Sequence, residues 1–511
     1  MTQLSDMTPN PPPRGPTYGA RATHGMAAAG MVVVVAKLSS VASQFMLGWL
    51  LSKNDFALYG LAISLGALVS ILRDGGTSKV LLQRGPENYS HLARPVLQMS
   101  LGFNILAALL LVSCATSLAD LFATEDIADI ENRLPPLIWV IAASLPIMSP
   151  VARLRVRLSL SLRFGAIARV DVRSAILRHS SMILLALLGF GPMSFVLPSL
   201  IVAISEWIMF SRAAANEPKP ERVNLSWPVF KDLFGASKWL MLTACMSAVV
   251  NFGDNLSIGK LQPAVLGDYV FAFGLSAALG ALFGDSIRSV LMATFVHLKH
   301  DPDRHGRAFM QTVRLSSFAL TPIFVGAALM APLLIQIAWW DGRWMHISLI
   351  VQLLMLSLVM RTLTPLGLAG IESVGRWRLL AGLLALDGVG TVAVASLAAW
   401  YGGLVEIAIA VSINRAVMGL LQCMVAAGLS GVRNPVISVL VGVAPPYILG
   451  AAAGIAALMI ANMLVGETIW LHSFVAAGLF AILFSAGALA GMKRRVRELT
   501  QRIQAVVKRR R

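Results

Sequence analysis

About fourteen apolar stretches of roughly 20 residues each follow one another between Met26 and Met492, joined by short links. A helix that crosses a membrane needs about 20 mainly apolar residues. A β-barrel of the outer membrane would show strands of about ten residues with alternating polarity, which this sequence lacks. A soluble fold could not bury a chain of 511 residues that is 57% hydrophobic and 13% charged. The sequence therefore predicts an all-α, polytopic integral membrane protein.

The predicted spans leave little room for a catalytic domain. We place them at 26–50, 55–73, 95–119, 134–154, 164–190, 192–212, 235–258, 264–290, 308–335, 346–371, 378–400, 402–428, 434–462 and 468–492. The longest polar links are too short to fold as domains and carry no phosphate-binding motif. The three cysteines fall within predicted spans without CxxC spacing, which indicates neither a disulfide framework nor a zinc site. We expect a transporter or scaffold that is not an enzyme and needs no metal or cofactor.

The formal net charge of +17 is distributed unevenly along the chain. Lysine and arginine gather in alternate links, the first of which holds Arg73, Lys79, Arg84 and Arg94, whereas the intervening links are nearly bare. This alternation is the positive-inside pattern, and it predicts an even number of spans with both termini in the cytoplasm. A nucleic-acid-binding protein would carry its cations on one surface, so we expect no nucleic-acid partner.

The two ends of the chain differ from the spans. Residues 1–25 are rich in proline and polar side chains and lack the parts of a signal peptide, which predicts a disordered cytoplasmic tail. Residues 493–511 space Val496, Leu499, Ile503 and Val506 at helical intervals among cations. This pattern predicts a basic amphipathic helix on anionic lipid headgroups. We interpret it as a topological anchor, the alternative being a specific lipid or partner site.

Two segments of the chain resemble each other. The segments GWLLSKNDFALYGLA (Gly48–Ala62) and GKLQPAVLGDYVFA (Gly259–Ala272) share a glycine, a tyrosine and an alanine when one gap is allowed. An acid with a basic neighbour follows each copy, namely Arg73 with Asp74 and Asp285 with Arg288. This internal similarity favours two parallel repeats, related by an axis along the membrane normal, around a central cavity.

The segment Leu50–Arg84 resembles the opening signature of polysaccharide flippases of the MOP exporter superfamily. Its matching residues are Leu50, Leu51, Phe56, Tyr59, Asp74, Gly75, Gln83 and Arg84. Leu162–Val172 is similar to the start of the fifth helix of that family, and Asn251–Ala272 to its seventh and eighth helices, with Asp254, Gly267 and Tyr269 in the expected places. The chain departs from the family at Ala57, where glycine is frequent.

The resemblance implies a flippase that works by alternating access. Its cargo would be a polyprenyl-pyrophosphate-linked oligosaccharide, which passes from the cytoplasmic to the periplasmic leaflet of a bacterial inner membrane for surface polysaccharide synthesis. Its partners would be this cargo, membrane lipids and other membrane proteins of polysaccharide assembly. The chain then divides into the tail 1–25, an N-lobe of six helices (26–215), a C-lobe of six (216–430), an added helix pair (431–492) and the basic tail 493–511.

Charged side chains at membrane depth are costly and usually face a cavity or a partner, so they are the candidate site residues. The cations are Lys37, Arg73, Arg169, Arg173, Arg288, Arg314, Arg361 and Arg415. Guanidinium groups match phosphate oxygens in charge and geometry, so several of these cations in one cavity would bind a pyrophosphate. The alternative for Arg169 and Arg173 is that they reach the headgroups or pair with Asp171.

Acids in the predicted spans have two possible roles, as ion-coupling groups or as fixed charge partners of the arginines. The candidates are Asp74, Asp254, Asp285 and Asp387, with Glu206 and Glu406 as further acids. The sequence leaves three other functions open: a multidrug exporter of the same superfamily, a membrane-embedded polysaccharide polymerase or ligase, and a lipid-binding scaffold. Organic cations would prefer acidic or aromatic walls, and a polymerase would need a large outward loop with reactive residues, which the short links lack.

Overall fold

Helices make up nearly all of the regular structure. The computed structural model describes residues 36, 38–69, 76–161, 163–217, 221, 223–281, 295, 301–465 and 469–492. Residues 38–50 are helical, and no strand occurs within the described ranges. The helices that follow are α2 (Lys53–Val69), α3 (Thr77–Gln83), α4 (Tyr89–Phe122), α5 (Ile130–Leu160), α6 (Phe164–Leu187), α7 (Met193–Ala213), α8 (Trp227–Leu261), α9 (Pro263–Ala281), α11 (Pro302–Ala338), α12 (Ser348–Arg361), α13 (Leu363–Ser373), α14 (Trp377–Tyr401), α15 (Leu404–Leu429), α16 (Pro435–Val465) and α17 (Ile469–Gly491).

The chain is a multi-pass membrane protein. Eleven segments of the described chain are long and apolar enough to cross a membrane, and α12 and α13 form one of them together. Each predicted span overlaps a helix of the structure. Helix α6 is not among the eleven segments, because it carries Arg178 in addition to Arg169, Asp171 and Arg173. The all-α class is confirmed, whereas the total of about fourteen spans stays a prediction.

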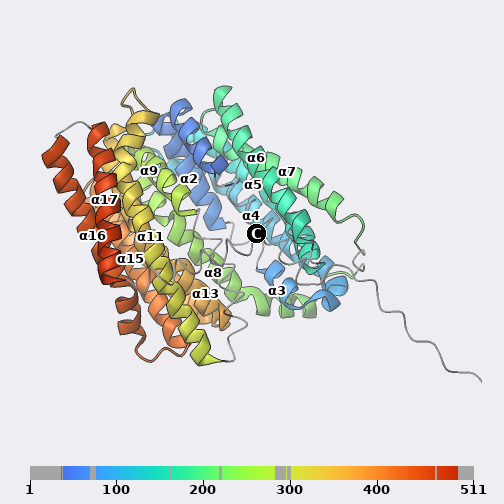
Figure 1. Cartoon of the computed structure of the whole chain (residues 1–511). Helices are drawn as coiled ribbons and strands as arrows, with labels where there is room; N and C mark the ends of the chain where they lie inside the picture. Colours follow the sequence, from blue (N-terminus) through green and yellow to red (C-terminus); the bar gives the residue numbers. More distant parts are fainter. Residues whose placement is uncertain are drawn as a thin grey trace, which may run out of the picture.

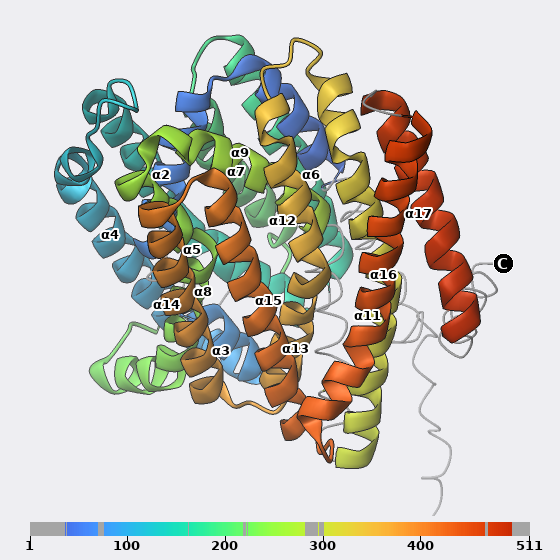
Figure 2. The ribbon, with the colours of Figure 1, turned by 90° about the vertical axis from the view of Figure 1, so that its left-hand side faces the viewer.

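The helices form two groups that meet along α2, α8 and α9. Figure 1 shows α2 and α4–α7 on one side and α11, α15, α16 and α17 on the other. We call the helices up to α7 the N-lobe and α8–α15 the C-lobe. Helix α2 packs on α8 and α9, and α8 packs along α14. The last two helices, α16 and α17, lie outside the C-lobe against α11 (Figures 1 and 2).

Aromatic side chains close the interface between the lobes at its predicted periplasmic end. The ring centroids of Phe56 in α2 and Phe271 in α9 are 4.7 Å apart. The indole of Trp344, in the link between α11 and α12, donates a hydrogen bond to the Gly48 carbonyl at 2.9 Å. An ion pair of 3.0 Å joins Lys53 Nζ to the buried Asp268 Oδ2. Burial of these large rings and the ion pair hold the two lobes together at this end.

The opposite end of the interface is closed as well. Helix α3 rests on α8, where Leu81 and Val80 pack with Leu233 and Leu240 in one buried apolar cluster. An ion pair of 2.6 Å joins Arg84 Nη2 to Asp232 Oδ2. Figure 1 shows α3 at the same end of the bundle as the start of α11. Contacts therefore join the lobes at both ends of the described interface.

Gly267 allows a close approach between the lobes, and its replacement gives a first prediction. A Cβ atom at Gly267 would lie 2.1 Å from the Lys53 carbonyl oxygen, which is far inside van der Waals contact. We expect Gly267→Ala to separate the lobes at this end. The measurement is the distance between spin labels at Phe190→Cys and Trp340→Cys, two exposed link residues, in a background that lacks the native cysteines. The distance should lengthen in Gly267→Ala.

Gly102→Ala is the matched control for this experiment. Gly102 is also a helical glycine, but nothing lies within 4 Å of a Cβ atom added there. The label distance should therefore stay as in the parent protein. An unchanged distance in Gly267→Ala would show that this backbone contact does not hold the lobes closed.

Candidate functional site

A buried ion pair lies in the middle of the C-lobe. Arg415 in α15 donates from Nη2 to Asp254 Oδ2 in α8 at 2.8 Å. The side chains are only 6% and 1% exposed. The hydroxyl of Tyr269 donates to the same carboxylate oxygen at 2.8 Å, and the Asn255 backbone N–H donates to the other oxygen at 3.0 Å. Asp254 is thus a charge partner with both oxygens occupied, which satisfies the condition for burying a carboxylate.

A second guanidinium group lies beside this pair without a carboxylate of its own. Arg361 is the last residue of α12, and its guanidinium lies 5.3 Å from the centre of the Phe273 ring. Arg415 lies 4.6 Å from the same ring. No carboxylate of the described residues comes within 4.0 Å of the Arg361 guanidinium. Asp254 is therefore paired with Arg415, and Arg361 has no ion-pair partner among the described residues.

The sequence after Arg361 explains why this cation lies at a break in the helix. Helix α12 ends at Arg361 and α13 begins at Leu363. Pro365 has no N–H, so it cannot bond to the carbonyl of residue 361 as a continuous helix would require. The break leaves the Arg361 carbonyl without this bond, and Thr362 and Thr364 beside it both line the same cavity.

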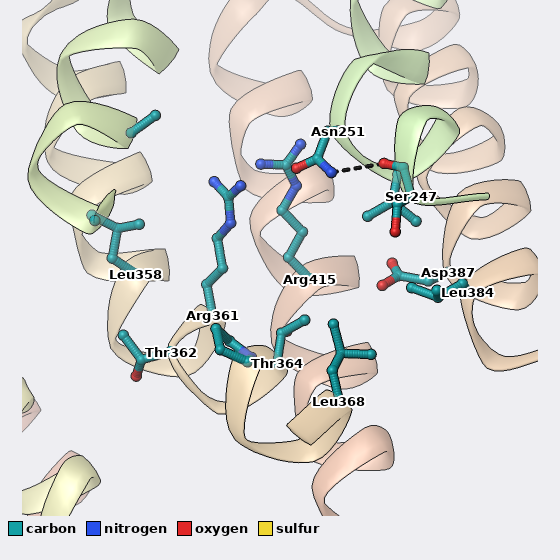
Figure 3. Close-up of a pocket in the computed structure, with 14 residues that line it drawn as sticks. Ser247, Asn251, Leu358, Arg361, Thr362, Thr364, Leu368, Leu384, Asp387 and Arg415 are labelled. Atoms are coloured by element: carbon teal, nitrogen blue, oxygen red, sulfur yellow. Dashed lines mark hydrogen bonds between the residues drawn. The ribbon is translucent and has the colours of Figure 1, made fainter. Parts of the chain in front are cut away.

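A cavity of about 340 Å³ brings these groups together. Figure 3 shows the side chains of Arg361 and Arg415 running in the same direction within it, with Asp387 on the opposite wall. Helices α8, α9, α12, α13, α14 and α15 all contribute to the lining, whose polar residues are Ser247, Asn251, Arg361, Thr362, Thr364, Asp387 and Arg415. Arg361 without an ion-pair partner among the described residues, with amide and hydroxyl donors around it, favours an anionic group with hydroxyl-bearing neighbours.

Asp387 has amide partners in the structure. Gln422 Nε2 donates to Asp387 Oδ2 at 3.1 Å, and Asn414 Nδ2 makes a longer contact of 3.5 Å with Oδ1. Asn414 also donates to the Thr391 hydroxyl at 3.0 Å. The structure thus gives Asp387 neutral hydrogen-bond donors, in contrast to Asp254. The ion-coupling role of both acids stays a prediction.

The remaining candidate residues lie elsewhere. Arg169 and Arg173 are exposed on α6, and Asp171 pairs with Arg155. Arg314 lines a different hollow beside α16. Five candidates lie outside the described residues, namely Lys37, Arg73, Asp74, Asp285 and Arg288. The structure therefore brings together Arg361, Arg415, Asp254 and Asp387 from the predicted set.

The sequence analysis missed a polar pocket in the N-lobe. This pocket of about 240 Å³ is lined by Arg178, His179 and Tyr59 together with Ser40, Ser43, Gln44 and Ser199. Ser43 Oγ lies 2.8 Å from His179 Nδ1. The adjacent Arg178 and His179 lie within the predicted span 164–190, and that pair of basic residues inside an apolar span was the available signal.

Comparisons with known proteins place the chain in a family. A sequence search against curated proteins finds no match. A family model does match, and residues 46–349, more than half of the chain, fit the family described as polysaccharide biosynthesis protein. The chain belongs to this family. The predicted resemblance to a family of polysaccharide biosynthesis is confirmed.

This chain, a member of the polysaccharide biosynthesis family, has the fold of known flippases and transporters. The lipid II flippase MurJ in an inward closed conformation gives a TM-score of 0.67 at 12% identity, over 90% of this chain and 99% of that one. An inward-facing multidrug resistance transporter of the MATE family gives 0.56 at 15% identity, over 78% and 95%. A mutant of the Vibrio cholerae MATE transporter VcmN gives 0.54 at 14% identity, over 82% and 98%. At these identities the likeness shows the fold alone.

Proposed function

We propose that this protein is a flippase that moves a polyprenyl-pyrophosphate-linked oligosaccharide from the cytoplasmic to the periplasmic leaflet of a bacterial inner membrane. The observation that carries the proposal is the Arg361 guanidinium, which faces the C-lobe cavity with no carboxylate of the described residues in ion-pair range. An unneutralised cation at membrane depth is costly, so its presence indicates an anionic partner that arrives from outside the protein.

The pyrophosphate would bind where Arg361 and Arg415 converge. Arg361 offers its fork of N–H donors, and Arg415 lines the same cavity while it is paired with Asp254. Asn251, Ser247 and Thr364 around them offer amide and hydroxyl groups to the first sugar. The polyprenyl chain would stay in the lipid, since about 0.8 kcal/mol is gained for each CH₂ group kept out of water.

Transport would follow from alternating closure of the two ends of the lobe interface. Contacts join the lobes at both ends in this conformation, through Lys53–Asp268 and the aromatic rings at one end and Arg84–Asp232 with α3 at the other. Opening the α3 end would admit the headgroup, and opening the Lys53 end would release it. An ion gradient or removal of the product on the far side would drive the cycle.

The charge of the cavity weighs against the multidrug exporter as the alternative. Organic cations bind to carboxylates or aromatic faces. Here Asp254 is neutralised by Arg415, and the two guanidinium groups already occupy the Phe273 ring, so that Asp387 is the carboxylate of the described cavity lining left for an organic cation. The membrane-embedded polymerase or ligase has less support, because the links at the predicted periplasmic end are short.

Depletion of the protein in a cell that makes the polysaccharide tests the proposed function. Lipid-linked repeat units should accumulate on the inner leaflet, where an added membrane-impermeant glycosidase cannot reach them, and the parent chain should restore their appearance outside. Full-length units left unpolymerised on the outer leaflet would instead identify a polymerase. Unchanged lipid-linked units together with increased drug sensitivity would identify a drug exporter.

A further inference from the structure

A second polar hollow lies between α11, α16 and the end of α17. Its volume is about 750 Å³, larger than that of the C-lobe cavity. The C-lobe cavity is lined by α8, α9 and α12–α15, so the two sites share no lining residue. We call this second hollow the headgroup groove and define it by Arg307, Gln311, Arg314, Arg433, Ser438 and Met492.

The cations of the headgroup groove share one side of α11. Arg307, Gln311 and Arg314 are spaced by four and three residues, which places them on one face of a helix over about 10 Å. Arg433 approaches this face from the link between α15 and α16. Three guanidinium groups therefore surround one hollow, with the Ser438 hydroxyl and the Gln311 amide among them.

Glycines make the space that these cations need. A Cβ atom at Gly442 in α16 would lie 3.3 Å from the Arg314 Cγ atom, so a larger residue would press on this side chain. A Cβ atom at Gly306 in α11 would lie 2.8 Å from the Ser430 carbonyl oxygen. The absence of side chains at Gly442 and Gly306 lets α16 and the link with Arg433 come close to α11.

The charges in the headgroup groove are not balanced. Asp303 is the one acid among the lining residues, and no carboxylate of the described residues comes within 4.0 Å of Arg307, Arg314 or Arg433. Apolar side chains complete the walls, among them Met310, Leu315 and Met492. A hollow with several guanidinium groups beside apolar walls at one end of a membrane bundle fits a phosphate that is attached to an acyl chain.

We propose that the headgroup groove binds the phosphate of an anionic phospholipid at the predicted cytoplasmic surface. The Arg307 and Arg314 guanidinium groups bond to the phosphate oxygens, Arg433 closes the third side, and the acyl chains lie along α16 and α17, whose Leu440, Ile437 and Leu489 are exposed. This binding holds the added helix pair against the C-lobe and is separate from cargo binding in the C-lobe cavity.

The test measures lipid binding to the full-length, detergent-purified protein by native mass spectrometry. Phosphatidylglycerol should bind more tightly than phosphatidylcholine. The double variant Arg307→Gln/Arg314→Gln should bind phosphatidylglycerol about 30-fold more weakly, the change expected when two cations near an anionic headgroup are removed. Thermal melting first verifies that the double variant and the parent are both folded. Equal binding of phosphatidylglycerol by the two proteins would then overturn the proposal.

Arg304→Gln is the matched control. Arg304 is on the same helix, but it pairs with Asp301 at 3.1 Å, is 72% exposed and does not line the groove. Arg304→Gln should bind phosphatidylglycerol as tightly as the parent. If this variant lost as much binding as Arg307→Gln/Arg314→Gln, only the general surface charge would matter. Addition of millimolar inorganic phosphate or pyrophosphate should not displace the lipid. Displacement would identify a soluble phosphate site and overturn the lipid assignment.

Discussion

Replacing Arg361 with glutamine is expected to lower the rate of cargo flipping by about 10- to 150-fold, the effect of losing a hydrogen bond to a charged group worth about 1.5–3 kcal/mol. The reason is that Arg361 is the cation of the C-lobe cavity without a carboxylate within 4.0 Å in the described structure. The measurement is the flipping of a fluorescent polyprenyl-pyrophosphate oligosaccharide in proteoliposomes, read by a reagent that reaches only the outer leaflet.

Two further variants separate the charge of Arg361 from its shape and position. Arg361→Lys keeps the charge but loses the planar fork, so its rate should lie between those of the parent and the glutamine variant. Arg376→Gln removes an exposed arginine just before α14 that does not line the cavity, and it should flip cargo at the parent rate. Parent-like flipping by Arg361→Gln would remove this residue from the cargo site.

Breaking the buried pair of Asp254 and Arg415 should have the largest effect on stability. Either Asp254→Asn or Arg415→Gln leaves an uncompensated charge in a site where the side chains are 1% and 6% exposed. Removal of one partner of a buried pair typically costs about 3–5 kcal/mol. We expect both single variants to melt at clearly lower temperatures in detergent, and Arg415→Gln to lose its approach to the Phe273 ring as well.

The double variant Asp254→Leu/Arg415→Met shows whether the pair stabilises the fold through charge pairing. Apolar side chains of similar volume can replace a buried ion pair at little cost, so the double variant should recover most of the lost stability. Asp171→Asn is a matched control in an exposed pair, where Arg155 and Asp171 are 42% and 32% exposed. Its cost should stay below about 1 kcal/mol. Equal losses in Asp171→Asn and Asp254→Asn would contradict the structural role of the buried pair.

The architecture could be predicted from the sequence because lipid imposes a simple rule. Every backbone group in the membrane must be satisfied within its own segment, so an apolar stretch of about 20 residues becomes a helix. Each predicted span from 55–73 onward accordingly overlaps an observed helix, whereas α3 lies outside the predicted spans and the span 346–371 is divided into α12 and α13. The position of the helix break at Thr362 was harder to predict from the sequence. Pro365 indicates a bend, but it does not tell where the preceding helix ends.

The site was harder to predict, because the sequence does not say which face of a helix meets which neighbour. Arg314 and Arg361 look alike as cations within apolar spans, yet one lines the headgroup groove and the other the C-lobe cavity. Asp254 was recognised as a candidate from the motif that it shares with Tyr269, and the structure joins these two by a hydrogen bond. Its pairing with Arg415 depends on the contact between α8 and α15, which no local pattern reveals.

Binding of a polyprenyl-pyrophosphate oligosaccharide to the purified protein, compared with the same molecule carrying a neutral linkage in place of the pyrophosphate, tests the central claim most directly. We predict that the pyrophosphate form binds at least tenfold more tightly and that Arg361→Gln removes this preference while the double variant of the headgroup groove keeps it. Equal binding of the two forms by the parent protein would contradict the claim that the arginines of the C-lobe cavity recognise the cargo.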